Sequence, residues 1–294
     1  MPPQSVGYLY ALAAFTIFAA QDGISKHLGS AYPPVFVAMV RYWAFAIFVI
    51  ILAMRSQGGI RQAASTRRFF LQAGRGALLA IQIVMSIISF SIVGLAHTHS
   101  IFASAPLLVA ALSVPILGEQ VGWRRWSAIL VGFLGVLIIL KPDESGFDMT
   151  LIITFAAALM SAIYSVMTRL ASRTDPAMTS FFYTGVPGAV VLTLIGPFYW
   201  VNMAPADWGW MLALCITGMS GHYLLIRAFE LADAASVQPF SYYQLVLVSI
   251  VGVTIYGEVL SVHMVVGAAI VIAAGLFTIW RERRAARKER LSTP

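Results

Sequence analysis

The chain has 294 residues, of which 60% are hydrophobic and only 11% are charged. A soluble domain has a smaller apolar share and more charge, so this composition excludes most soluble enzymes and binding modules. A core of this size could not hide so many apolar side chains, and lipid must cover them. The single cysteine, Cys215, excludes a disulfide framework.

Apolar runs close to the roughly 20 residues that cross a bilayer core recur along the whole chain. The N-terminus has no basic region and its first apolar run continues as a full span, so we expect no cleavable signal peptide. The linkers are short, and Pro33, Pro34 and Pro176 stand where a helix begins and a missing N–H does little harm. We place ten transmembrane segments at 6–28, 34–54, 70–92, 96–117, 123–140, 150–170, 177–200, 207–228, 232–256 and 260–280.

The pattern of the first half returns in the second half. The stretches 95–140 and 231–280 both open on Leu-Ala, carry a proline within the first apolar run, and close that run with Gly-Glu. These prolines are Pro106 and Pro239, and a helix rich in small residues follows in each copy. Such self-similarity indicates a duplicated unit. We expect one repeat over residues 1–140, a second over 150–280, and a basic cytoplasmic tail over 281–294.

The basic residues predict the orientation in the membrane. With the N-terminus inside, fifteen Lys and Arg residues fall on the inner side, and only Lys26 and Lys141 fall on the outer side. This positive-inside bias places both termini in the cytoplasm. It also explains the net charge of +7 without a nucleic-acid partner. Because each half holds five helices, the second half enters the membrane from the opposite side, which gives inverted repeats.

The motifs resemble those of the drug/metabolite transporter superfamily, in its ten-helix EamA-like branch. The resemblance rests on Ala103–Pro106 with Leu117–Glu119, on Arg41 after Pro33–Pro34, and on Gln238–Pro239 with Gly257–Glu258. It implies an all-α integral membrane protein of the bacterial inner membrane that moves small organic metabolites by alternating access. The first-helix sequence QDGISKHL is similar to a subgroup that includes importers of riboflavin and S-adenosylmethionine. Amino acids and drug-like compounds are also superfamily substrates.

The first predicted helix carries an ionisable pair. Asp22 and Lys26 lie four residues apart on one helix face and can neutralise each other. Alternatively, Asp22 faces a central cavity and takes a proton or a cationic group of the substrate. Gln21 can hydrogen-bond either the cavity or a neighbouring helix. Proton coupling and simple uniport or exchange therefore both stay open.

Polar residues in the next two helices also need partners. We expect Arg75 to reach the cytoplasmic headgroups by snorkelling, and Arg41 either to pair between helices or to contact an anion. Gln82, Ser86 and Ser89 form a polar stripe that must face protein or water. The stripe either lines a cavity or holds helices together.

The second half carries aromatic rings with hydroxyl and amide groups, which suit a planar organic substrate because faces stack and polar tips orient. The same residues also serve as packing and interface aromatics. The candidate substrate-binding residues there are Tyr164, His222, Tyr223, Gln238, Tyr242 and Gln244, which would act together with Gln21, Asp22, Gln82 and Ser86.

Other chemistries find little support in the sequence. His97 and His99 point to different helix faces and have no carboxylate or thiol beside them, so we expect an interface position at the outer mouth and no metal site. A phosphate-binding loop and a nucleophile elbow are absent, which disfavours ATP-driven transport and a membrane enzyme. We expect no cofactor and a monomer or homodimer. A non-transport membrane protein, an enzyme or receptor on the same bundle, is the alternative.

Overall fold

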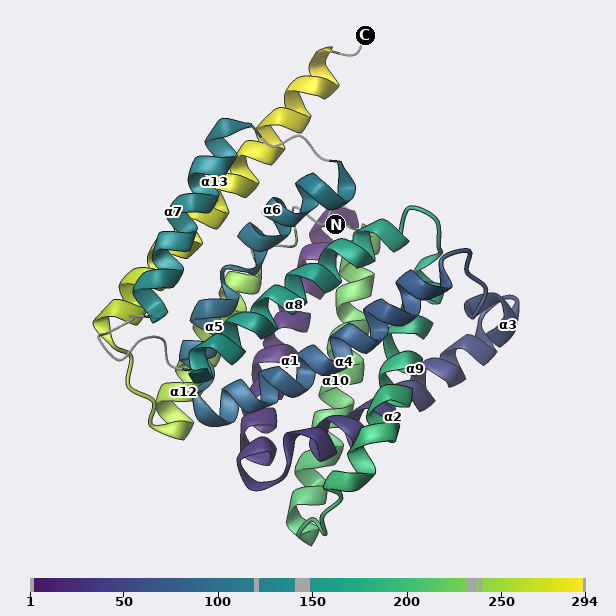
Figure 1. Cartoon of the computed structure of the whole chain (residues 1–294). Coiled ribbons are helices and arrows are strands. Elements are labelled where there is room, and N and C mark those ends of the chain that lie inside the picture. The colour runs from purple at the N-terminus through teal and green to yellow at the C-terminus, as the bar shows by residue number, and fades with distance from the viewer. Residues whose placement is uncertain (1–2, 119–121, 141–148, 232–236, 238–239, 293–294) are drawn as a thin grey trace.

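The computed structural model describes residues 3–118, 122–140, 149–231, 237 and 240–292, and this part of the chain is helical with no strand (Figure 1). The N-terminal half contains α1 to α7 and the C-terminal half contains α8 to α13. The elements are α1 (Pro3–Ala31), α2 (Pro34–Arg55), α3 (Gly59–Ala63), α4 (Phe69–Ile92), α5 (Leu95–Phe102), α6 (Ala105–Leu117), α7 (Trp123–Leu140), α8 (Met149–Ala171), α9 (Ala177–Ile195), the 3-10 helix η1 (Gly196–Tyr199), α10 (Pro205–Leu231), α12 (Phe240–Tyr256) and α13 (Val262–Ser292).

Many of these helices are suited to lipid. In the described residues, five segments are long and apolar enough to cross a membrane: Pro34–Arg55, Phe69–Ile92, Leu95–Leu117, Thr150–Ala171 and Ala177–Tyr199. Large apolar side chains such as Leu194, Phe198 and Leu212 are exposed on the helix surfaces. Monomeric soluble proteins do not expose so much apolar surface. The expectation of an all-α membrane protein is confirmed at this level.

Proline and glycine set several helix boundaries. Helix α2 begins at Pro34 and α9 follows Pro176, as expected. The predicted segment 96–117 is interrupted, because α5 ends at Phe102 and α6 starts with Pro106 in its first turn. Gly94 before α5 has φ 100° and Gly118 after α6 has φ 71°, a backbone region that favours glycine.

The helices of the two halves pack in a reciprocal manner. Helix α1 packs against α10 and α12 of the C-terminal half, while α8 packs against α4 and α6 of the N-terminal half. Helices α2 and α9 are neighbours. Helices α7 and α13 lie side by side at one edge of the molecule (Figure 1). Each half is therefore completed by helices of the other.

Two glycines allow the close approach of α7 and α13. A Cβ atom added to Gly135 would lie 2.9 Å from the carbonyl oxygen of Gly267, and one added to Gly267 would lie 2.6 Å from that of Gly135. Because both obstacles are backbone atoms, neither can move aside cheaply. Small residues are the usual way to bring helices together in lipid, where packing drives association.

We expect Gly135→Ala to lower the free energy of unfolding by about 1–3 kcal/mol, the usual cost of overpacking. The thermal unfolding midpoint of the detergent-purified protein measures this effect. Gly209→Ala is the matched control, because a Cβ there meets nothing within 4 Å. Equal midpoints for the two variants would contradict the close α7–α13 contact.

Candidate functional site

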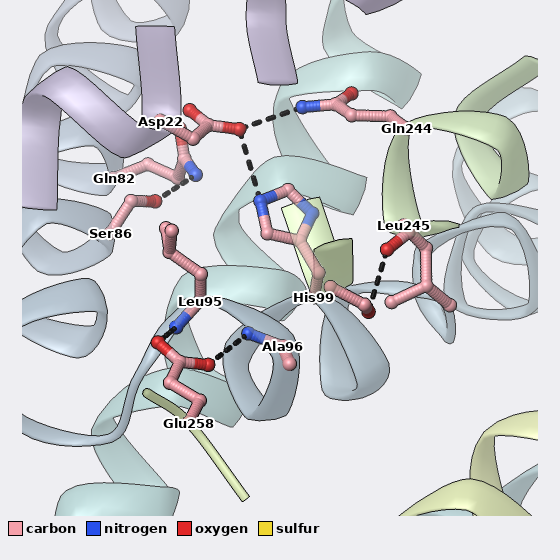
Figure 2. A network of polar contacts seen from close by, with 10 residues as sticks. Asp22, Gln82, Ser86, Leu95, Ala96, His99, Gln244, Leu245 and Glu258 are labelled. Atoms are coloured by element: carbon pink, nitrogen blue, oxygen red, sulfur yellow. Dashed lines mark hydrogen bonds and ion pairs between the residues drawn. The ribbon is translucent and has the colours of Figure 1, made fainter. Parts of the chain in front are cut away.

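Asp22 of α1 joins three helices in the interior of the bundle (Figure 2). Its Oδ2 atom accepts a hydrogen bond of 2.7 Å from Gln244 Nε2 of α12, and it lies 3.0 Å from His99 Nε2 of α5. The side chains of Asp22 and His99 are each only 10% exposed. We call Asp22, His99 and Gln244 the Asp22 cluster. The Asp22 cluster connects a buried carboxylate of α1 to an imidazole of α5 and an amide of α12.

The position of His99 differs from our expectation. It is buried and its ring stacks on Phe90 of α4, with the centroids 5.5 Å apart and the planes at 6°. The expected placement at the outer mouth is therefore wrong. His99 lies one turn after the start of the short helix α5, where its ring packs against Phe90 and lies within hydrogen-bond distance of Asp22.

Gln82 and Ser86 of α4 lie near Asp22 in Figure 2. The Gln82 amide donates a 2.8 Å hydrogen bond to the hydroxyl of Ser86, and both residues are buried. Further along α4, Ser89 accepts a 3.0 Å hydrogen bond from the hydroxyl of Thr154 in α8. At its Ser89 end the stripe holds α4 and α8 together, which is one of the two alternatives stated for it; whether Gln82 and Ser86 line a substrate cavity stays a prediction.

Lys26 does not pair with Asp22, so the first of the two alternatives for Asp22, a pair within α1, is wrong. It forms an ion pair with Glu258, in the connection between α12 and α13. The Glu258 carboxylate also accepts hydrogen bonds of 2.7 Å and 2.9 Å from the backbone N–H groups of Leu95 and Ala96 (Figure 2). These are unsatisfied donors at the start of α5, where a negative charge is favourable. Lys26, Leu95, Ala96 and Glu258 form the Glu258 cluster.

The surroundings of Glu258 act on its carboxyl in opposite directions. Burial alone would raise its pKa, but the hydrogen bonds from Lys26, Ala96 and Leu95 outweigh burial and hold the pKa below its usual value of 4.5. The carboxyl is thus ionised at neutral pH. It acts as an electrostatic contact between α1, α5 and the α12–α13 connection.

Arg75 of α4 lies inside the protein and does not reach the headgroups, so its expected snorkelling is wrong. It is 1% exposed, and it donates hydrogen bonds to Gln72, to the hydroxyls of Tyr164 and Thr168 in α8, and to the backbone of Ser180 in α9. Gln72 in turn donates a 2.8 Å hydrogen bond to Asp175, which lies between α8 and α9. We call this group the Arg75 cluster. Like the Glu258 cluster, it joins the two halves.

A small cavity lies between α2, α4 and α10. Arg41 and Phe45 of α2, Ile83 of α4, and Cys215 and His222 of α10 are among its lining residues. The space open to water is about 10 Å³, roughly enough for one water molecule. A metabolite cannot fit in this conformation, so binding requires the helices to separate.

The predicted second-half residues are spread over the protein. Tyr164 contacts Arg75, and His222 lines the cavity. Tyr223 is 44% exposed on the helix surface, while Tyr242 is buried against Gly275 of α13. Gln238 lies outside the described residues. Of this set, the structure brings only Gln244 to Asp22, and their functional roles stay predictions.

The sequence offered weak signals for the two missed partners. His99 was visible as a histidine in an apolar run, but its spacing to Asp22 is 77 residues. Glu258 ends an apolar run within a Gly-Glu turn, which suggested only a turn. A better signal was Gly94, because a helix that starts after it leaves N–H groups that need an acceptor.

Comparison with known proteins identifies the family to which the chain belongs and several similar transporters. The sequence profile of the EamA-like transporter family matches residues 5–141 and 148–280. The S-adenosylmethionine uptake transporter of Rickettsia bellii is 29% identical over 97% of each chain. The riboflavin transporter of Vibrio cholerae is 30% identical over 97% of this chain and 96% of its own. The pseudopaline exporter CntI of Pseudomonas aeruginosa is 25% identical over 91% and 94%.

A solved crystal structure superposes with a TM-score of 0.63 and 17% sequence identity, covering 96% of this chain and 98% of that chain. This likeness supports the fold alone. The apolar helices define a helical membrane protein, and the family match assigns it to the transporter class. The chain belongs to the EamA-like transporter family, and the resemblance noted in the sequence is confirmed.

We expect Glu258→Gln to lower the free energy of unfolding by about 1.5–3 kcal/mol at neutral pH, because hydrogen bonds to a charged acceptor are lost. The lowered pKa of Glu258 means that its stabilisation is complete above about pH 4.5 and is lost as the pH falls through the folded-state pKa. Thermal unfolding in detergent between pH 3 and pH 7 measures both effects. The wild-type midpoint should fall more steeply with acid than that of the variant, and parallel curves would contradict this role.

Proposed function

We propose that this protein is a secondary transporter that carries a small organic metabolite across the bacterial inner membrane by alternating access. One observation carries the proposal: the polar clusters join the N-terminal and C-terminal halves around a cavity that is too small for a metabolite. A carrier of this kind must open toward each side in turn. Polar contacts between halves suit that task, because water can replace them when the halves separate.

The proposed architecture is ten transmembrane helices in two inverted five-helix repeats. Three shorter apolar helices, Trp126–Leu140, Phe240–Tyr256 and Val262–Thr278, and the long helices α1 and α10 add to the five clear spans. The reciprocal packing of α1 on α10 and α12, and of α8 on α4 and α6, supports a two-fold relation. The positive-inside bias supports cytoplasmic termini.

In this orientation the Glu258 cluster closes the outer end of the bundle. The Arg75 cluster closes the inner end, where α4 begins and α8 gives way to α9. Each cluster takes residues from both halves. The conformation described is therefore an occluded one, with Asp22, Arg41 and His222 between the two closures.

The names of relatives suggest probes for the substrate. Relatives are named as carriers of S-adenosylmethionine, riboflavin and pseudopaline, all small organic metabolites. We propose a substrate of this size that contacts Gln21, Asp22, His222 and Gln244. Gln82 and Ser86 lie close to the same region.

Counterflow in proteoliposomes tests the function. Vesicles loaded with unlabelled solute should take up the labelled solute without ATP, and S-adenosylmethionine, riboflavin and an aromatic amino acid are the first probes. Vesicles with the Gly209→Ala variant should behave like the wild type, because that substitution touches nothing. Folded wild-type protein that exchanges none of these probes would contradict the proposal.

We further propose that Asp22 couples transport to protons. Its carboxylate lies within hydrogen-bond distance of His99 of α5. Two basic side chains are near: Arg41 of α2, which interacts electrostatically with Asp22, and Lys26 of α1, which is already paired with Glu258. Protonation of the Asp22 carboxylate would remove the negative charge that its contacts with His99 of α5 and Gln244 of α12 share, and would weaken both. The protonation state and the conformation are thereby linked.

Asp22→Asn should abolish pH-gradient-driven accumulation while leaving solute exchange intact, because the amide keeps the shape of the carboxylate but takes up no proton. Accumulation and exchange are compared in the same proteoliposomes. Asp207→Asn is the matched control, because Asp207 bonds His27 and Tyr32 away from this cluster. Equal loss of both activities, or of neither, would make Asp22 a structural residue.

A further inference from the structure

Arg41 is an exception among the buried basic side chains. It is 8% exposed, yet in the described residues it makes no hydrogen bond and no ion pair within 4 Å. Arg75, which is also buried, donates to four residues, and Lys26 is paired with Glu258. A guanidinium offers five N–H donors and stays charged, so an enclosed one without acceptors is unfavourable.

The unpaired guanidinium lines the cavity between α2, α4 and α10. The carboxylate that acts on it electrostatically is Asp22, which is already held by His99 and Gln244. The rest of the lining is mostly apolar, with Phe45 and Ile83, while the His222 ring lies against Phe45 at a centroid distance of 5.6 Å. The cavity therefore presents one positive charge among apolar and aromatic walls.

Gly218 keeps the space beside this charge free. A Cβ atom there would lie 3.3 Å from Arg41 Nε and 3.3 Å from the side-chain oxygen of Gln21. That Gln21 oxygen is buried and accepts no hydrogen bond from the described residues. Unused donors and an unused acceptor thus face the same spot, and such groups are rare in native interiors unless a ligand satisfies them.

We propose that Arg41 binds the carboxylate of the transported solute and that Gln21 accepts a hydrogen bond from an N–H group beside it. This inference rests on the proposed transport function and names the substrate class, a metabolite with an amino-acid head group. A guanidinium pairs with a carboxylate through two parallel hydrogen bonds. A phosphate would also pair with the guanidinium, but it brings no N–H group for the Gln21 oxygen, whereas an amino-acid head group brings both.

Cys215 provides a direct probe of this charge. It is the only cysteine of the chain and lines the same cavity as Arg41. Two methanethiosulfonate reagents of similar size, one carrying a sulfonate and the other a trimethylammonium group, are compared for their rates of thiol modification in proteoliposomes. The rates are normalised to those with free 2-mercaptoethanol. We expect the anionic reagent to be favoured by roughly tenfold, because a charged, enclosed site concentrates opposite charge.

Arg41→Gln should remove this preference, and Arg41→Lys should retain it. Arg55→Gln is the matched control, because Arg55 is an exposed residue at the end of the same helix. An unchanged preference in Arg41→Gln would overturn the proposal. Wild-type protein that reacts with neither reagent would also overturn it, because the cavity would then not open to water.

A second measurement uses only wild-type protein. Counterflow is compared for S-adenosylmethionine and decarboxylated S-adenosylmethionine, and for tryptophan and tryptamine, pairs that differ by the carboxylate alone. We expect at least tenfold faster exchange of the carboxylates, the factor that about one charge-assisted hydrogen bond supplies. Equal exchange within both pairs would leave the transport function intact and overturn the role of Arg41. Selective Cys215 labelling without any counterflow would contradict the transport function and leave the anion site standing.

Discussion

Charged side chains in the interior of this protein need partners from the protein itself, from water or from a ligand, because lipid offers none. That constraint organises the described part of the structure. The Lys26 ammonium needs Glu258, the Glu258 carboxylate needs the start of α5, and Arg75 needs hydroxyls on α8. In each case the partner belongs to the other half of the chain. The polar contacts therefore specify how the two halves meet, while apolar packing within the bundle provides most of the buried contact area between the helices.

These contacts also limit how the halves can separate. Apolar faces such as the Gly135–Gly267 crossing of α7 and α13 approach backbone to backbone and lose their packing if they part. The Glu258 and Arg75 clusters consist of an ion pair and hydrogen bonds, whose partners water can replace when the halves separate. Movement is therefore easier at the two ends of the bundle than along the α7–α13 seam. Between those ends lies Arg41, the enclosed charge that no described side chain neutralises.

The sequence predicted the fold better than the site. Helix positions follow from apolar runs and from Pro34, Pro106 and Pro176, which are local signals. The partner of Asp22 could not be predicted, because Lys26 is its neighbour along the helix while His99 is its neighbour in space. Sequence spacing gives the face of a helix but not the helix that packs against that face.

The same limit applies to Arg75 and Tyr242. Arg75 stands near a helix end, where snorkelling is the usual outcome, yet Gln72 and the hydroxyls of α8 enclose it. Tyr242 follows a break in the sequence pattern beside polar residues, yet its ring lies against Gly275. Both placements depend on contacts between distant segments.

We expect the contacts between the halves to open and close while the protein stays folded. Spin labels at Ser30, at the end of α1, and at Val259, beside Glu258, would report the distance across the Glu258 end of the bundle in lipid nanodiscs, with Cys215 replaced by serine. We expect a short-distance population together with a longer one that Glu258→Gln enriches. A single short distance, unchanged by that substitution in folded protein, would contradict it.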